Sequence, residues 1–185
     1  MAMVYTAIAV AMTWPLATHL GTSLAADQGD PAFNTWVLTW TAGQMLAALR
    51  GNIGALATYW HGNIFYPETL TLAYSEHLTP LAIQALPIYA ATGNGLTAYN
   101  VLFISTFALS GLAVYLLVRD LTEQPLAAFV AGLAYAYAPY RFGQLSHLQV
   151  LSSYWMPLVL LGFHRYFTRV TTGAGTMARR RALAG

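Results

Sequence analysis

The chain has 185 residues, of which 57% are hydrophobic and only 8% are charged, and it contains no cysteine. A soluble domain carries about 25% charged residues, so this composition excludes an ordinary soluble enzyme and a disordered tail. The lack of cysteine excludes disulfides and thiolate metal ligands. A net charge of +2 is too small for the basic surface that binds nucleic acid. We therefore predict an all-α integral membrane protein whose partner is the lipid bilayer, with no nucleic-acid partner.

Four segments are predicted to cross the membrane. The first, within 1–20, has no basic residues before its apolar run, which favours an uncleaved span over a secretory signal peptide. Three more apolar runs, at 97–118, 122–139 and 150–167, are also predicted as spans. A loop is expected to follow at 168–185.

Two further apolar stretches lie in the large loop 21–96, between the first and second spans. Segment 78–92 has two prolines and is too short for a span. Segment 31–50 is long enough to cross, but a polar stripe runs along one helical face beside tryptophan-rich apolar faces. The residues of this stripe are Asn34, Thr41 and Gln44. Such a helix is more typical of the membrane interface, so both stretches are predicted to be interfacial helices.

The arginines predict the orientation of the four spans. If 78–92 does not cross and the N-terminus is cytoplasmic, six of the eight arginines lie inside, and only Arg50 and Arg141 lie outside. If 78–92 crosses, seven lie outside. The positive-inside rule favours the first arrangement. We therefore expect one transmembrane domain over 1–185, with the loop 21–96 on the outer side.

Four of the six acidic residues fall in this outer loop. They are Asp27, Asp30, Glu68 and Glu76. Carboxylates at a membrane interface are costly unless they are paired, hydrated or used in chemistry. Partial desolvation raises the pKa of a carboxylate toward that of a useful base, and Asp30 or Asp27 could supply it. Arg141, expected just after the third span on the same side, offers forked donors suited to a phosphate.

Several strings in and beside this loop carry a family resemblance: GDPAFNTWVLTW at 29–40, NIFYPETLTLAYSEHL at 63–78, TAYN at 97–100 and APYRFGQLSHLQ at 138–149. Together they resemble bacterial membrane glycosyltransferases of the GT-C superfamily, which include relatives of protein O-mannosyltransferases and aminoarabinose transferases. The resemblance covers nearly the whole chain, in order and in topology. Because the full-length relatives have more spans, the chain corresponds to their N-terminal portion, which we do not expect to be active alone.

The resemblance implies sugar transfer from a polyprenyl-phosphate donor to an acceptor at the outer face of the bacterial plasma membrane. An acidic residue early in the first outer loop then acts as base or metal ligand, which by position is Asp30, with Asp27 second. The adjacent carboxylate pair of many relatives is missing, because Pro31 follows Asp30. This favours a base over a metal ligand and leaves a divalent cation open. The expected substrate-binding residues are Glu76, His77, Asn100, Arg141, His147 and Gln149.

Each of these residues also has a purely structural interpretation. Asp30 before Pro31 fits a helix N-cap, Arg141 could extend to lipid headgroups, and His147 with Gln149 could satisfy a loop. Two other functions remain alternatives. A transporter or flippase component would place ionisable groups near the bilayer midplane, and a non-catalytic or truncated membrane protein would keep the fold without the activity.

Overall fold

The computed structural model describes residues 1–182, with side chains described up to Val170. All regular secondary structure in this range is helical, which confirms the predicted all-α class. The longer helices are α1 (Ala2–Met12), α2 (Asp30–Leu49), α4 (Thr79–Thr92), α5 (Gly95–Thr122), α6 (Pro125–Ala136) and α9 (Trp155–Ala182). The remaining elements are single turns: η1 (Leu16–Thr18), α3 (Gly54–Ala57), η2 (Thr71–Tyr74), α7 (Pro139–Phe142) and α8 (Leu148–Leu151).

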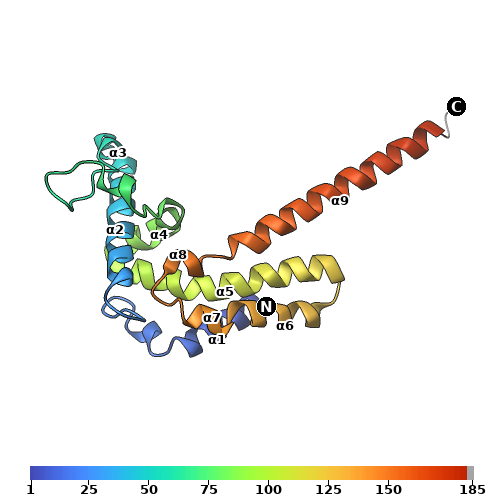
Figure 1. Ribbon diagram of the computed structural model, residues 1–185, viewed down its shortest axis with the longest axis horizontal. Helices are drawn as coiled ribbons and strands as arrows, with labels where there is room; N and C mark the ends of the chain where they lie inside the picture. Colours follow the sequence, from blue (N-terminus) through green and yellow to red (C-terminus); the bar gives the residue numbers. More distant parts are fainter. Residues whose placement is uncertain (183–185) are drawn as a thin grey trace.

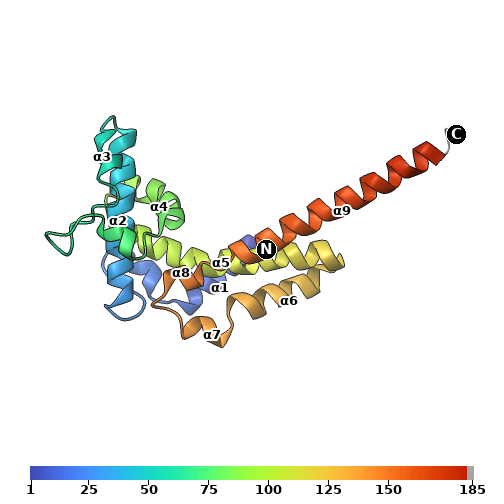
Figure 2. The ribbon, with the colours of Figure 1, turned by 45° about the horizontal axis from the view of Figure 1, so that its top comes forward.

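Helix α5 is the axis of the molecule. Helices α1, α6 and the start of α9 pack along it. In the chain order α1, α5, α6, α9, each helix runs in the direction opposite to the one before it (Figures 1 and 2). Helices α2 and α4 lie at the N-terminal end of α5, with α3 at the far end of α2, and the α5–α6 turn lies at the other end of α5 (Figure 1). The loop between α7 and α8 returns toward α2.

Helix α2 runs roughly perpendicular to α5 and packs against α4 (Figure 1). Both α2 and α4 begin and end within one residue of the predicted helices 31–50 and 78–92. Two residues of the polar stripe, Asn34 and Thr41, are buried, with 1% and 0% of their surface exposed. Asn34 donates to Gln149 of α8, and the Thr41 hydroxyl donates to the Val37 carbonyl of its own helix.

The helices differ in length from the predicted spans. Among the described helices, only α5 is both long and apolar enough to cross a membrane. Helices α1 and α6 have 11 and 12 residues, fewer than the roughly 20 that a span needs. Proline explains these limits, since Pro15 closely follows α1, while Pro125 begins α6 and Pro139 follows it.

Helix α9 also departs from the prediction. It begins at Trp155 rather than near 150, and its backbone remains helical to Ala182. The loop predicted for 168–185 is therefore wrong over 168–182, and residues 183–185 lie outside the described residues. No turn-forming proline follows Pro157, so the helical backbone continues.

The Tyr5 side chain of α1 contacts both α5 and α6. It is fully buried, its hydroxyl donates to the Phe129 carbonyl at 3.1 Å, and its own carbonyl accepts from the Tyr137 hydroxyl at 2.6 Å. A Cβ at Gly111 would lie 2.7 Å from the Tyr5 ring, and one at Gly132 would collide with its hydroxyl. Glycine at both positions therefore lets α1, α5 and α6 approach closely.

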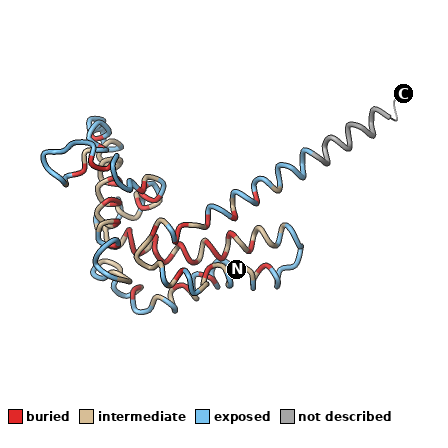
Figure 3. The backbone as a smooth tube through the Cα atoms, viewed as in Figure 1, coloured by how far each residue is buried: buried red, intermediate tan, exposed pale blue. Residues whose placement is uncertain are grey.

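The main core surrounds the N-terminal half of α5. Tyr99, Phe103 and Phe107 are almost fully buried there, against apolar residues of α2 and α4 that include Val37 and Leu81. Figure 3 shows this contrast, since the part of α9 whose burial is described, up to Val170, is mostly exposed after its first turns. The best-packed part of the molecule thus supports the loops at one end of α5.

Candidate functional site

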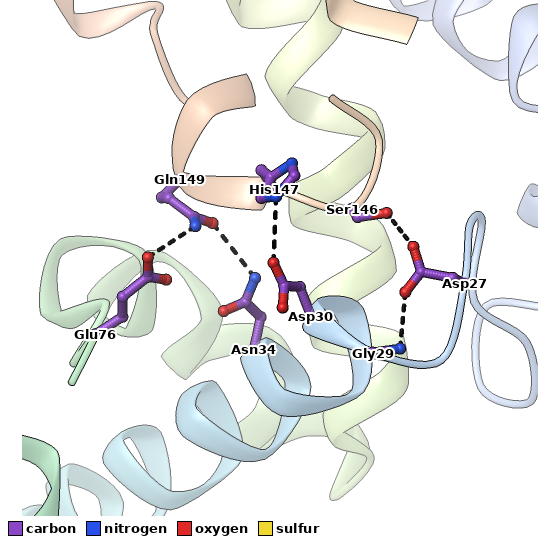
Figure 4. Close-up of polar contacts among 8 residues, drawn as sticks. All are labelled: Asp27, Gly29, Asp30, Asn34, Glu76, Ser146, His147 and Gln149. Atoms are coloured by element: carbon purple, nitrogen blue, oxygen red, sulfur yellow. Dashed lines mark hydrogen bonds and ion pairs between the residues drawn. The ribbon is translucent and has the colours of Figure 1, made fainter. Parts of the chain in front are cut away.

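A polar cluster joins the start of α2 to the loop before α8, at the well-packed end of α5 (Figure 4). Its members come from three separate parts of the chain, and the name polar cluster is used for them below. They are Asp27, Asp30, Asn34, Glu76, Ser146, His147 and Gln149. Five of these seven were predicted as site residues from the sequence.

Asp30 pairs with His147 in this cluster. Asp30 Oδ2 lies 3.2 Å from His147 Nε2, and the two side chains are 57% and 40% exposed. Helix α2 begins at Asp30 itself, after Gly29, and no side chain caps it. The N-cap interpretation of Asp30 is therefore wrong, although a carboxylate in the first turn still interacts favourably with the helix dipole.

Both carboxylate oxygens of Asp27 accept a hydrogen bond. The Gly29 N–H donates to Oδ1 at 2.7 Å, and the Ser146 hydroxyl donates to Oδ2. These hydrogen bonds, that from Ser146 first, lower the pKa of Asp27 below its ordinary value. A carboxylate held in its charged form is a weaker base, so the geometry favours Asp30 over Asp27 as a proton acceptor.

A chain of amides completes the cluster. Asn34 Nδ2 donates to Gln149 Oε1 at 3.3 Å, and Gln149 Nε2 donates to Glu76 Oε1 at 2.9 Å. Neither Asn34 nor Ser146 was predicted as a site residue. The signal for Asn34 was its position one helical turn after Asp30, on the same face of α2. The only signal for Ser146 in the sequence was its position next to His147, a predicted site residue.

Two predicted residues lie apart from these contacts. Asn100 is fully buried, and its Nδ2 donates to the carbonyls of Leu20 and Ser23, each at 2.7 Å. His77 Nδ1 is 2.7 Å from the Thr79 hydroxyl, and its ring meets the edge of Trp60. The structure therefore gives Asn100 the role of holding the chain after η1, and places His77 at the start of α4.

Arg141 lies deeper than predicted. Its guanidinium donates to the Leu151 carbonyl and the Ser153 hydroxyl, both at 2.8 Å, and to the Thr106 carbonyl at 3.4 Å. Its Cζ is 5.2 Å from the centre of the Phe107 ring. Thr106 lies about 17 Å along α5 from Gly95 at 1.5 Å per residue, so Arg141 is beside the middle of α5. It lies there rather than beside the end of α5 because α6 is short.

A cavity of about 610 Å³ opens beside Arg141. Gln149 and Ser153 contribute to its wall, and the other lining residues are largely apolar. Arg141 is only 5% exposed, its Nε has no hydrogen-bond partner, and it forms no ion pair with a described acidic residue. A buried cation without a counter-charge is costly, so this cavity suits an anion with an apolar tail.

The acidic residues do not assemble into a metal site. Over the part of the chain that the structure describes, no group of three or more His, Asp or Glu side chains is placed to hold a metal ion. The residues of the polar cluster therefore do not fit the divalent cation that the sequence left open.

Comparisons with protein-family models, curated proteins and solved structures find no match to this chain.

Proposed function

We propose that this protein is a membrane glycosyltransferase of the GT-C type. It would transfer a sugar from a polyprenyl-phosphate donor to an acceptor at the outer face of the bacterial plasma membrane. The proposal depends above all on the 3.2 Å contact between Asp30 and His147, which joins residues far apart in the sequence at an accessible position. The resemblance of the sequence to GT-C enzymes supplies the reaction class.

The proposal includes four membrane crossings, by α1, α5, α6 and α9. The alternating direction of these helices (Figure 1) and the arginine distribution support it. The perpendicular orientation of α2 is what a helix in the membrane plane would have if α5 crosses. The polar cluster then lies on the outer side, with the N-terminus in the cytoplasm.

Asp30 would be the base of the reaction. As the acceptor oxygen attacks the anomeric carbon, its proton passes to the free oxygen of the Asp30 carboxylate. The bond between the anomeric carbon and the phosphate oxygen breaks, and the phosphate leaves with its negative charge. Arg141 would stabilise that charge, and the apolar walls beside it would accommodate the prenyl chain. Gln149 belongs to the polar cluster and also lines this cavity, so it would connect the site of Asp30 to that of Arg141.

The first prediction tests the base. Asp30→Asn keeps the side-chain shape and one of the two oxygens, but its amide cannot take up the proton. We expect thermal stability close to wild type and sugar transfer lowered by about 100-fold or more, the typical scale for a positioned base. Transfer from polyprenyl-phosphate sugar would be measured with the natural protein, at its full length, in membrane vesicles. Glu68→Gln, an acid of the same loop outside the cluster, is the matched control. Wild-type turnover in Asp30→Asn would contradict the proposal.

The second prediction concerns donor binding by Arg141. Arg141→Lys keeps the charge but loses the forked donor geometry, so we expect affinity for polyprenyl phosphate to fall by about 10-fold or more. Ser153→Ala removes one of the contacts that hold Arg141 while keeping the guanidinium, and should retain donor binding. Binding would be measured in nanodiscs by displacement of a labelled lipid phosphate. Equal affinity in Arg141→Lys and wild type would exclude Arg141 as the phosphate ligand.

A transporter or flippase component is the second candidate function. The specific observation in its favour is Arg141 beside the middle of α5, since intramembrane ionisable groups commonly mark substrate pathways. Proteoliposomes would separate the two functions. Vectorial movement of the lipid-linked sugar without formation of a glycosylated product would favour the transporter.

A further inference from the structure

Helix α2 carries an aromatic stack on a face away from the polar cluster. Phe33, Trp36 and Trp40 are spaced by three and four residues, which places them on one side of the helix. The ring centres of Trp36 and Trp40 are 6.4 Å apart, with 26° between the ring planes. The Trp36 N–H donates to Asn63 Oδ1 at 3.0 Å, and the Trp40 N–H donates to the Tyr59 carbonyl at 3.1 Å. Both indoles are therefore fixed in place.

A cavity of about 330 Å³ lies beside these two rings. This volume is at the lower end of the range of about 300–1,000 Å³ for small-molecule sites. Besides the two tryptophans, its wall includes Gly43 and Gln44 of α2, Asn63 of the following loop and Tyr89 of α4. None of the described residues that line it is Asp, Glu, Arg or His.

We propose that this cavity binds a neutral carbohydrate. The electron-rich faces of aromatic rings attract the polarised C–H groups of a pyranose ring, and the two neighbouring indoles form an aromatic wall for them. The amides of Gln44 and Asn63 and the Tyr89 hydroxyl can donate to and accept from sugar hydroxyls. An ionic ligand would find no opposite charge among the described residues that line the cavity.

The hydrogen bonds of the tryptophans favour this proposal over a membrane anchor. A tryptophan that anchors a protein at the interface directs its polar end to the wet headgroup region. Here both indole N–H groups are bonded within the protein, so the rings serve as a wall rather than as anchors. The site is separate from Asp30, and its ability to bind a sugar does not depend on the transfer reaction proposed above.

Gly43 provides a direct test of the carbohydrate site. A Cβ at Gly43 would meet only the Tyr89 ring, at 4.0 Å, which is an ordinary contact. Because Gly43 lines the cavity, Gly43→Leu should add side-chain volume there, and its Cβ fits beside Tyr89 without displacing it. A Cβ at Gly162 of α9 would have no neighbouring atom within 4 Å, so Gly162→Leu is a matched glycine-to-leucine control remote from the cavity.

Binding would be measured by saturation-transfer NMR on the protein in nanodiscs that contain no sugar-based detergent. The probes are the methyl glycosides of glucose, mannose, galactose and N-acetylglucosamine, with methyl glucuronide as the charged comparison. We expect wild type, Gly162→Leu and Asp30→Asn to bind at least one neutral glycoside with a Kd on the order of 1 mM. Gly43→Leu should weaken that binding by about 10-fold or more, a difference of about 1.4 kcal/mol.

Three results would overturn the proposal: no binding of any neutral glycoside, unchanged binding in Gly43→Leu, or methyl glucuronide binding as well as the glucose glycoside. The first is also the result expected of a membrane anchor. Retained sugar binding in an Asp30→Asn protein that has lost transfer, or in a protein that shows no transfer at all, separates this site from the proposed reaction.

Discussion

Asp27 and Asp30 lie three residues apart, yet their surroundings give them different chemistry. Asp27 accepts hydrogen bonds at both oxygens, from Gly29 and Ser146, whereas Asp30 contacts His147 through one oxygen. The sequence predicted that an acid in this loop would matter and ranked Asp30 first. It could not predict the engagement of Asp27, because Ser146 reaches it only after α5 and α6 have brought the two loops together.

The pKa of Asp27 leads to the third prediction, which concerns acid stability. A carboxyl group whose pKa is lower in the folded protein stabilises the fold above its ordinary pKa of about 3.9. That contribution is lost as the pH falls through the lower, folded value. We expect the melting temperature of wild type to drop more steeply in this acid range than that of Asp27→Asn.

Melting curves from neutral to acid pH would measure this difference, with Glu68→Gln as the control. Because Asp27 lies at the surface, the effect should be small. If the melting temperature of Asp27→Asn falls as steeply at acid pH as that of wild type, the Ser146 contact does not favour the charged form of Asp27.

At the scale of elements, the positions of α2 and α4 were predictable from local signals. A proline stands near the beginning of each helix, and the apolar pattern stops where each helix ends. The lengths of α1 and α6 were not, because the apolar runs continue past Pro15 and up to Pro139, although each regular helix ends before its proline. The depth of Arg141 depends on the same error. A residue after a full-length span lies at the membrane surface, whereas one after a 12-residue helix lies beside the middle of α5.

The fourth prediction tests the contact between α1, α5 and α6. In Gly132→Ala, the new methyl group would collide with the Tyr5 hydroxyl and would lie only 2.6 Å from the Gly111 carbonyl oxygen. We expect a loss of about 1–3 kcal/mol, the usual cost of overpacking, measured as a lower unfolding midpoint in detergent. Gly162→Ala, in open space, should be neutral or stabilising. Gly132→Ala as stable as Gly162→Ala would show that the three helices pack less closely.

At the scale of the whole molecule, the fifth prediction tests the orientation. Glu68 and Glu123 are exposed and lie toward opposite ends of α5, and the chain has no cysteine of its own. Single substitutions Glu68→Cys and Glu123→Cys should therefore react with an impermeant thiol reagent from opposite sides of sealed vesicles. Lysed vesicles are the control, since both sites should then react. Labelling of both from the same side of intact vesicles would contradict the proposed crossing by α5.

The short helices α1 and α6 also have a consequence for the surrounding lipid. At 1.5 Å per residue they rise only about 17 and 18 Å, while the hydrocarbon layer is about 30 Å thick. Helix α5, with 28 residues, exceeds that thickness. In a bilayer that these helices cross as proposed, one flank of the protein would therefore be mismatched to the thickness that suits the other. Lipid beside α1 and α6 would then have to thin locally, or water and headgroups would have to descend toward the level of Arg141. Such a depression would bring the head of an amphiphile down to the buried guanidinium while its chains remain among the other lipids.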